Sequence, residues 1–177
     1  MVARLRNLTA LLVPLGVAVL VTTAARPVAA GEITLFWAHN NGAQSDPAAT
    51  PGGSWRNGMG ATLTLGLVKV AQVEIEGARG LDAQSVLRLT YFTAGAALKF
   101  PFSMVTPFAG VGVGVYHESL GDTWMIDTHA VAFAGVKVRL ADLIVLRGEY
   151  RRFQMRGTPL SGLSLESRVT LGAGIAF

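Results

Sequence analysis

The sequence predicts an all-β fold, an eight-stranded antiparallel up-and-down transmembrane β-barrel, and three observations support this class. First, 51% of the 177 residues are hydrophobic and only 15% are charged, whereas about 25% are charged in an ordinary soluble domain. Second, beyond residue 30 no apolar run reaches the roughly 18 residues that a membrane-spanning helix needs. Third, apolar and polar residues alternate along eight segments, as in strands with one apolar face. Closure into a barrel lets such strands cross a bilayer with their backbone groups paired.

The first 30 residues have the features of a secretory signal peptide. Two arginines precede an uncharged, mostly apolar stretch, and the segment ends in the small residues Val-Ala-Ala. This order is typical of a signal peptide that is removed by cleavage. We therefore predict a signal peptide over 1–30, cleaved before Gly31, and one barrel domain over 31–177. An uncleaved anchor helix over 8–25 is the alternative.

The charge and cysteine content exclude several classes of protein. Three of the 15 basic residues lie in the first 30 residues, so 12 basic residues remain against 11 acidic residues, and the net charge falls from +4 to +1. A nearly neutral chain has little electrostatic attraction for nucleic acid. The absence of cysteine excludes a disulfide scaffold and leaves no attachment point for a lipoprotein anchor.

Alternation with period two defines the predicted strands. In the last of them every odd-numbered residue from Leu165 to Phe177 except Ser167 is apolar, whereas the even-numbered residues are charged, polar or small. The pattern continues for more than ten residues, about the length that a tilted strand needs to cross a bilayer. The predicted strands cover 31–39, 57–67, 70–78, 86–100, 105–118, 128–140, 144–155 and 164–177.

The connections between these strands alternate in length, as in a barrel with long loops at one end and tight turns at the other. Arg88 and Lys99 fall on opposite faces of their segment, so we expect a bulge or an end effect near Thr90. The long connections are 40–56, 79–85, 119–127 and 156–163, and the short ones lie near 67–70, at 101–104 and at 141–143.

The charged residues indicate which face of the strands points inward. Glycines and charges of both signs share the face opposite the apolar one, and a narrow lumen favours small residues. An arginine or lysine facing lipid costs about 2–4 kcal/mol at the bilayer midplane. We therefore predict a plugged lumen that holds a structural ion-pair network rather than a diffusion pore. Its members are Glu74, Glu76, Lys137, Arg139, Arg147, Glu149, Arg151, Glu166 and Arg168.

Aromatic residues fit the two interface belts of a transmembrane barrel. The strand ends predict one group at the rim with the tight turns and one at the rim with the long loops, while Phe36 and Phe133 face the lumen. The first group is Phe100, Phe102, Phe108 and Phe177, and the second is Trp37, Trp55, Tyr116 and Trp124.

The chain resembles the outer-membrane β-barrel family of the OmpA transmembrane-domain and OmpX type over its whole length after residue 30. The resemblance rests on Thr-Pro-Phe-Ala-Gly-Val-Gly-Val-Gly-Val at 106–115, on Leu-Arg-Gly-Glu-Tyr-Arg at 146–151 and on a closing strand that ends in Phe177. It implies a monomer in the outer membrane of a Gram-negative bacterium, in contact with outer-membrane lipid and lipopolysaccharide. It also implies an assembly signal for the barrel-assembly machinery, formed by Val169, Leu171, Ala173, Ile175 and Phe177.

The resemblance favours a non-enzymatic role in envelope structure, or in surface interaction and adhesion through the loops 40–56 and 119–127. Fold does not fix function, so two alternatives stay open. One is a soluble lipocalin-like binding barrel, and the other is a hydrolase that modifies lipid A.

The hydrolase alternative depends on His117 and Ser119. An outer-membrane lipid A deacylase has a His-x-Ser-Asn pattern with a supporting Glu on its second-to-last strand, whereas here the pattern is on the fifth strand and lacks the Asn. No carboxylate is clearly placed to orient His117. We therefore predict no catalytic residues.

The sequence also predicts no metal site and no cofactor. His39, His117 and His129 lack the spacing of metal ligands. The glycines at 110, 112 and 114 lie within a predicted strand, and neither Lys-Ser nor Lys-Thr follows them, so they do not form a phosphate-binding loop.

Overall fold

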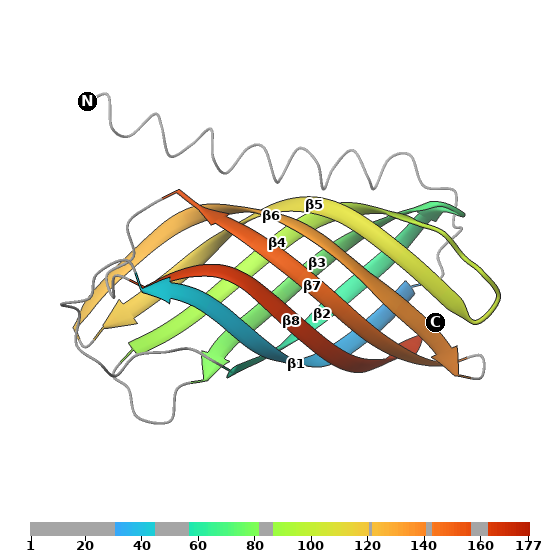
Figure 1. The fold of residues 1–177 in the computed structure, drawn as a ribbon, viewed down its shortest axis with the longest axis horizontal. Helices are drawn as coiled ribbons and strands as arrows, with labels where there is room; N and C mark the ends of the chain where they lie inside the picture. The colour runs from blue at the N-terminus through green and yellow to red at the C-terminus, as the bar shows by residue number, and fades with distance from the viewer. Residues whose placement is uncertain (1–30, 45–56, 82–86, 121, 141–142, 157–162) are drawn as a thin grey trace.

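The alternating segments fold into eight antiparallel strands in the computed structural model, which describes residues 31–44, 57–81, 87–120, 122–140, 143–156 and 163–177. Each strand pairs with the next, and β8 pairs with β1, so the sheet closes into a barrel (Figure 1). The fold class predicted from the alternation is confirmed. The strands are β1 (Gly31–Gln44), β2 (Asn57–Val68), β3 (Ala71–Leu81), β4 (Leu87–Lys99), β5 (Val105–Leu120), β6 (Thr123–Leu140), β7 (Ile144–Met155) and β8 (Leu163–Ala176).

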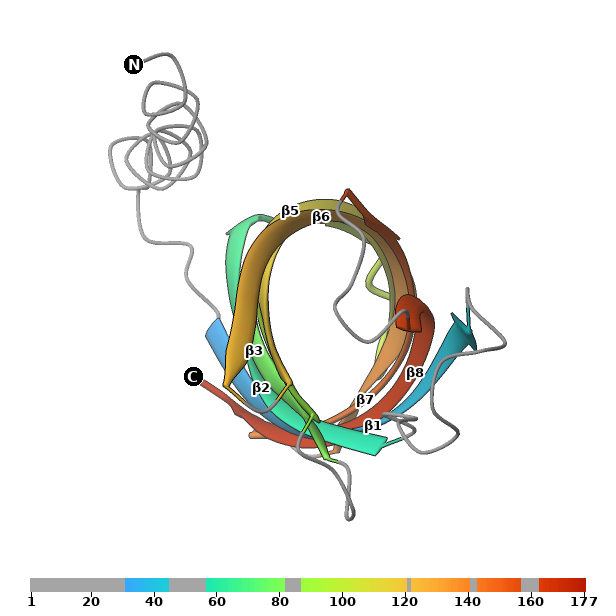
Figure 2. The same ribbon diagram turned by 90° about the vertical axis from the view of Figure 1, so that its left-hand side faces the viewer.

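The two ends of the barrel differ. One end, called the turn end, holds the short connections from β2 to β3, from β4 to β5 and from β6 to β7. The first and last residues of the barrel also meet there, because the backbone N–H of Gly31 donates to the carbonyl oxygen of Phe177 at 2.8 Å. The opposite end, which Figure 2 views, is called the loop end. Three of the predicted long loops fall largely on 45–56, 82–86 and 157–162, outside the described residues, as does the predicted signal peptide.

The expected loop over 119–127 is wrong, because most of it belongs to two strands. β5 continues to Leu120 and β6 begins at Thr123, and Ser119 pairs with Trp124. The reason lies in the side chains, since Trp124 and Ile126 continue the outward positions of β6 while Met125 packs against the apolar cluster in the lumen. Together these strands form a β-hairpin at the loop end.

The expected irregularity near Thr90 is an end effect and not a bulge. The pairing of β4 with β5 is unbroken from Leu87 opposite Leu120 to Lys99 opposite Phe108. Arg88 lies exposed beside the buried Leu89 at the loop end of β4, whereas Lys99 lines a cavity at the turn end. Arg88 and Lys99 lie at the two ends of β4, near water, so each face of this strand can carry one charged residue.

Side chains that face outward are mostly apolar, and those that face inward are mostly polar or aromatic. Leu35, Val111 and Leu171 are each about two-thirds exposed on the outer wall, whereas Thr34, Glu76 and other inward residues are buried. A soluble barrel would have the reverse arrangement. The structure therefore has the side-chain distribution of a barrel that lipid surrounds.

Glycines provide room for aromatic rings inside the narrow lumen. A Cβ atom added to Gly110 would lie 2.6 Å from Cζ of Phe133 and 2.7 Å from Cβ of Ala97. A Cβ atom added to Gly60 would likewise lie 2.5 Å from Cζ of Phe36. These distances are too short for non-bonded carbon atoms, so the rings occupy space that only glycine leaves free.

Two aromatic residues do not lie in the predicted belts. Phe108 and Tyr116 are buried in the lumen. Both occupy even-numbered positions of β5, and the even-numbered residues of this strand, such as Gly110, Gly112 and Gly114, face inward. The other predicted belt residues that the structure describes, Phe100, Phe102, Phe177, Trp37 and Trp124, are exposed. Trp55 lies outside the described residues.

Candidate functional site

Eight ionised side chains form a ladder along the axis of the lumen. Lys137 contacts Glu32 at the turn end, Arg147 follows with Glu74 and Glu149, and Arg151 leads to Glu76, which contacts Arg168 towards the loop end. Four cations alternate with four carboxylates, so the ladder has no net charge. We call these eight residues the lumen ladder: Glu32, Glu74, Glu76, Lys137, Arg147, Glu149, Arg151 and Arg168.

The middle of the ladder joins opposite walls of the barrel. Arg147 and Arg151 come from β7, and their partners Glu74 and Glu76 come from β3, four strands away in the closed sheet. Nη2 of Arg147 lies 2.7 Å from Oε2 of Glu74, and Nη2 of Arg151 lies 2.9 Å from Oε2 of Glu76. Both arginines also contact Glu149 on their own strand. Salt bridges across the lumen therefore fix β3 relative to β7.

Aromatic rings cover the guanidinium groups. The Cζ atom of Arg147 is 4.5 Å from the ring centre of Phe108, and that of Arg151 is 4.6 Å from Phe133. Such distances are typical of cation–π contacts, which strengthen when water is excluded. Arg151 is 1% exposed and Arg168 is 0% exposed, so both guanidinium groups are shielded from water.

Arg168 is the point where the ladder meets an aromatic cluster in the loop-end half of the lumen. Its Nη2 lies 2.5 Å from Oε1 of Glu76, while its Nε and Nη1 have no hydrogen-bond partner among the residues that the structure describes. Three rings surround its Cζ atom at 5.0–5.4 Å and take the place of those partners, namely Phe36, Tyr91 and Phe153. His129 packs against Tyr91 and Phe153 and shares a hydrogen bond of 2.9 Å with Thr93.

Seven of the nine predicted lumen residues belong to the ladder, and two do not. Glu166 is exposed rather than inward, because a register shift in the pairing of β1 with β8 leaves it without a partner: Asn41 pairs with Ser167 and Gly42 with Leu165. This bulge turns both Leu165 and Arg168 into the lumen and reverses the alternation between them.

Arg139 is the second exception, because it lies exposed at the turn end. Within the described ranges it has no carboxylate within 4.0 Å and so is not part of the ladder. Conversely, the sequence analysis missed Glu32. The signal that identifies Glu32 is its even-numbered position in the first strand, because Thr34 and Phe36 at the next even-numbered positions face inward.

In the described part of the chain, the acid within the His-x-Ser pattern lies on the opposite side of the barrel wall from His117. His117 is exposed on the outer wall and stacks on Trp124, with ring centres 6.2 Å apart, whereas the carboxylate of Glu118 points into the lumen and is fully buried. The acid beside His117 therefore faces away from it. Among the described residues no group of three His, Cys, Asp or Glu side chains is arranged to hold a metal ion.

Outward-facing arginines gather in the loop-end half of the barrel. Arg79 is near the end of β3, Arg88 is near the start of β4, and Arg152 and Arg156 are at the end of β7. All four are exposed, and Glu166 is an exposed acid in the same half. These four arginines are called the arginine girdle.

The predicted assembly residues form one exposed row on β8. Val169, Leu171, Ile175 and Phe177 are each between 44% and 66% exposed, and Ala173 is exposed between them. The residues between them face the lumen. The alternation of the closing strand is therefore present in three dimensions up to the last residue.

Several solved structures with the same architecture are bacterial outer-membrane proteins. The N-terminal β-barrel domain of Pseudomonas aeruginosa OprF superposes with a TM-score of 0.63 at 14% identity, over 84% of this chain and 97% of that one. Neisserial surface protein A (NspA) gives 0.61 at 15% identity, over 82% and 95%. The attachment invasion locus protein Ail of Yersinia pestis gives 0.59 at 17% identity, over 84% and 99%.

The chain has the fold of the eight-stranded outer-membrane β-barrels. Identities of this size establish the architecture and leave the role to be argued from the barrel itself. No protein-family model and no curated protein matches the chain. In the described part no helix is long and apolar enough to cross a membrane.

Proposed function

We propose that this protein is an integral, non-enzymatic barrel of the outer membrane that serves in envelope structure or in interaction at the cell surface. The observation that carries the proposal is the inverted distribution of side chains: a neutral ladder of buried charges inside and exposed apolar residues outside. An ordinary monomer exposes few contiguous large apolar patches, so the outer wall requires hydrocarbon around it.

Fractionation with a gel test of folding examines this proposal. Expressed in a Gram-negative host, the protein is expected in the detergent-extracted outer-membrane fraction, and the unheated sample is expected to migrate differently from the boiled one because a closed barrel resists detergent until it is heated. A protein that appears in the periplasm without detergent contradicts the proposal and favours the lipocalin-like alternative.

The hairpin of β5 and β6 supports a role at the surface. Trp124 and Ile126 are exposed on its outward side at 65% and 60%, and the paired strands hold them in fixed positions. Among the similar structures, Ail is named as an attachment invasion locus protein. A rigid hairpin with exposed aromatic and apolar residues is suited to bind another surface.

Lipopolysaccharide is the partner that the arginine girdle favours. Its arginines lie beyond the apolar wall on the loop-end side and project outward, where the phosphate groups of lipid A would lie if the loop end faces outside. Arginine binds phosphate in a bidentate manner. The exposed alternating row on β8 likewise supports recognition by the barrel-assembly machinery, as proposed from the closing strand.

The double substitution Arg79→Gln/Arg152→Gln tests the lipopolysaccharide proposal. A basic residue near an anionic membrane surface contributes about 1 kcal/mol, so the pair is expected to weaken binding of purified lipopolysaccharide by about 30-fold, as measured by titration in detergent. The matched control is Lys69→Gln/Lys99→Gln, which removes the same charge at the turn end. Equal binding by both variants and the unmodified protein would remove the girdle as the binding surface.

A further inference from the structure

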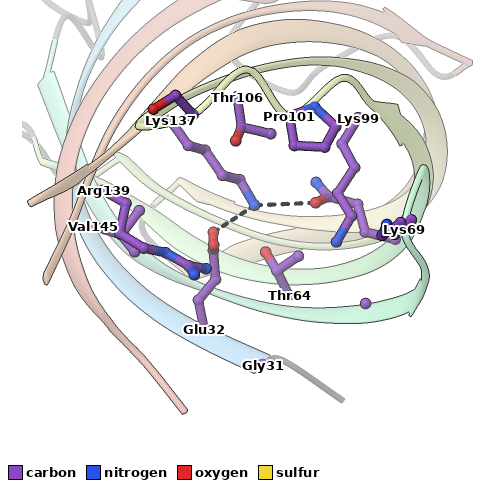
Figure 3. A pocket seen from close by; sticks show the side chains of 13 residues that line it. Gly31, Glu32, Thr64, Lys69, Lys99, Pro101, Thr106, Lys137, Arg139 and Val145 are labelled. Carbon is purple, nitrogen blue, oxygen red and sulfur yellow. Dashed lines mark hydrogen bonds and ion pairs between the residues drawn. The ribbon is translucent and has the colours of Figure 1, made fainter. Parts of the chain in front are cut away.

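A cavity of about 170 Å³ opens at the turn end of the lumen, below the ladder (Figure 3). A single water molecule needs only about 10–15 Å³ of such space, so the cavity has room for a small polyatomic ligand. Its basic side chains are Lys69 from the β2–β3 turn, Lys99 from the end of β4, and Lys137 and Arg139 from β6. Glu32 and Gln72 also line the cavity.

The charges of this cavity are not balanced, in contrast to those of the ladder. Nζ of Lys137 lies 2.6 Å from Oε1 of Glu32 and donates to Oε1 of Gln72 at 3.2 Å. Figure 3 shows these two contacts as dashed lines. Lys69, Lys99 and Arg139 have no carboxylate within 4.0 Å among the residues that the structure describes. Three positive charges, from the β2–β3 turn and from the turn ends of β4 and β6, therefore line one concave space.

The chemistry of the lining identifies the class of ligand. Ammonium and guanidinium groups only donate hydrogen bonds, so a matching ligand offers several anionic oxygens in a compact group. Thr64 and Thr106 add hydroxyl groups to the lining of the cavity. The cavity lies at the mouth of the lumen and not on the lipid-facing wall, which favours a soluble anion over a lipid headgroup.

We propose that the turn-end cavity binds a small phosphate-class anion, with Lys69, Lys99 and Arg139 as its ligands. Within the described residues, the ladder balances its own charges, whereas these three cations lack carboxylate partners. An anion in the cavity would complete the pattern of alternating charge that the rest of the lumen follows. The proposed site is separate from the arginine girdle, since the two lie at opposite ends of the barrel.

Calorimetric titration with sodium pyrophosphate at low ionic strength tests the site on protein extracted from membranes in zwitterionic detergent. We expect saturable binding with one anion per barrel. The Lys69→Gln/Lys99→Gln variant is expected to bind at least about tenfold more weakly, because it loses two charge-assisted contacts. The matched control, Asn57→Asp/Thr123→Glu, lowers the net charge by the same two units at exposed loop-end positions outside both the cavity and the arginine girdle, and is expected to change the affinity by less than about twofold. A heat-dependent shift on the gel shows that each variant is folded.

Two outcomes would overturn the proposal: non-saturable binding by the unmodified protein, or equal weakening in the two variants, which would indicate a general charge effect. A second arm identifies the source of the phosphate. In nanodiscs of phosphatidylcholine alone, pyrophosphate is expected to bind as in detergent. Inclusion of phosphatidylglycerol leaves the affinity unchanged if the ligand is a soluble anion, whereas competition supports the same site with a lipid phosphate as its occupant.

Discussion

Replacement of Arg151 by methionine is expected to lower the free energy of unfolding by about 3–5 kcal/mol, the usual cost of removing one partner from a buried ion pair. Arg151 contacts Glu74, Glu76 and Glu149, and its side chain is 1% exposed. Without it three cations face four carboxylates among buried side chains. Denaturant unfolding in lipid vesicles, followed by the gel shift of the folded barrel, measures the loss.

Two further variants separate charge from packing at this position. The double variant Arg151→Met/Glu149→Gln restores neutrality in the ladder, so we expect it to recover part of the lost stability. Arg79→Met removes an arginine from the outer wall, where water and lipid headgroups solvate the charge, and is expected to change stability by less than about 1 kcal/mol. A loss for Arg151→Met no larger than for Arg79→Met would show that the ladder does not stabilise the fold.

The substitution Leu35→Arg is expected to destabilise the barrel by about 2–4 kcal/mol in a bilayer, the cost of a basic side chain near the midplane on the lipid face. Leu35 is 67% exposed on β1, and its neighbours on the two flanking strands are Ala61 and Ala173. An arginine here has no carboxylate to approach and must leave water. The measurement is reversible unfolding in phospholipid vesicles.

The control for this prediction is Ile126→Arg, at the loop end of β6. Ile126 is 60% exposed, so the two sites have similar exposure and differ mainly in their position along the barrel. Near the interface the cost of arginine falls to about 0–1 kcal/mol. Equal and small effects at both positions would mean that water, and not hydrocarbon, covers the outer wall.

Much of the fold could be predicted from side-chain alternation. The parity of Arg147, Glu149 and Arg151 in one segment places all three on one face, and the structure has all three buried in the lumen. Alternation was insufficient where the pairing of strands shifts. Glu166 and Leu165 exchange faces because β8 has an extra residue opposite β1, and no residue type in that segment signals the extra residue.

Alternation does not predict which charges of the ladder pair with each other, because this depends on the stagger between strands. Arg168 meets Glu76 across 92 positions of sequence, and this pairing follows from the stagger between strands when the sheet closes. The cavity at the turn end arises in the same way, since Lys69 comes from the β2–β3 turn, Lys99 from β4 and Arg139 from β6. The sequence pattern predicted Arg139 as a member of the lumen network and assigned no site to Lys69 or Lys99, and the closed sheet places all three around one cavity.

The sequence by itself therefore determined the class of fold and the face on which most charges lie, because successive residues of a strand must point to opposite sides of the sheet. Only the tertiary structure decided which charges meet, where the alternation reverses, and where cations remain unbalanced. The physical reason is that the contacts across a barrel depend on the number of strands and on their stagger, which are properties of the closed sheet as a whole.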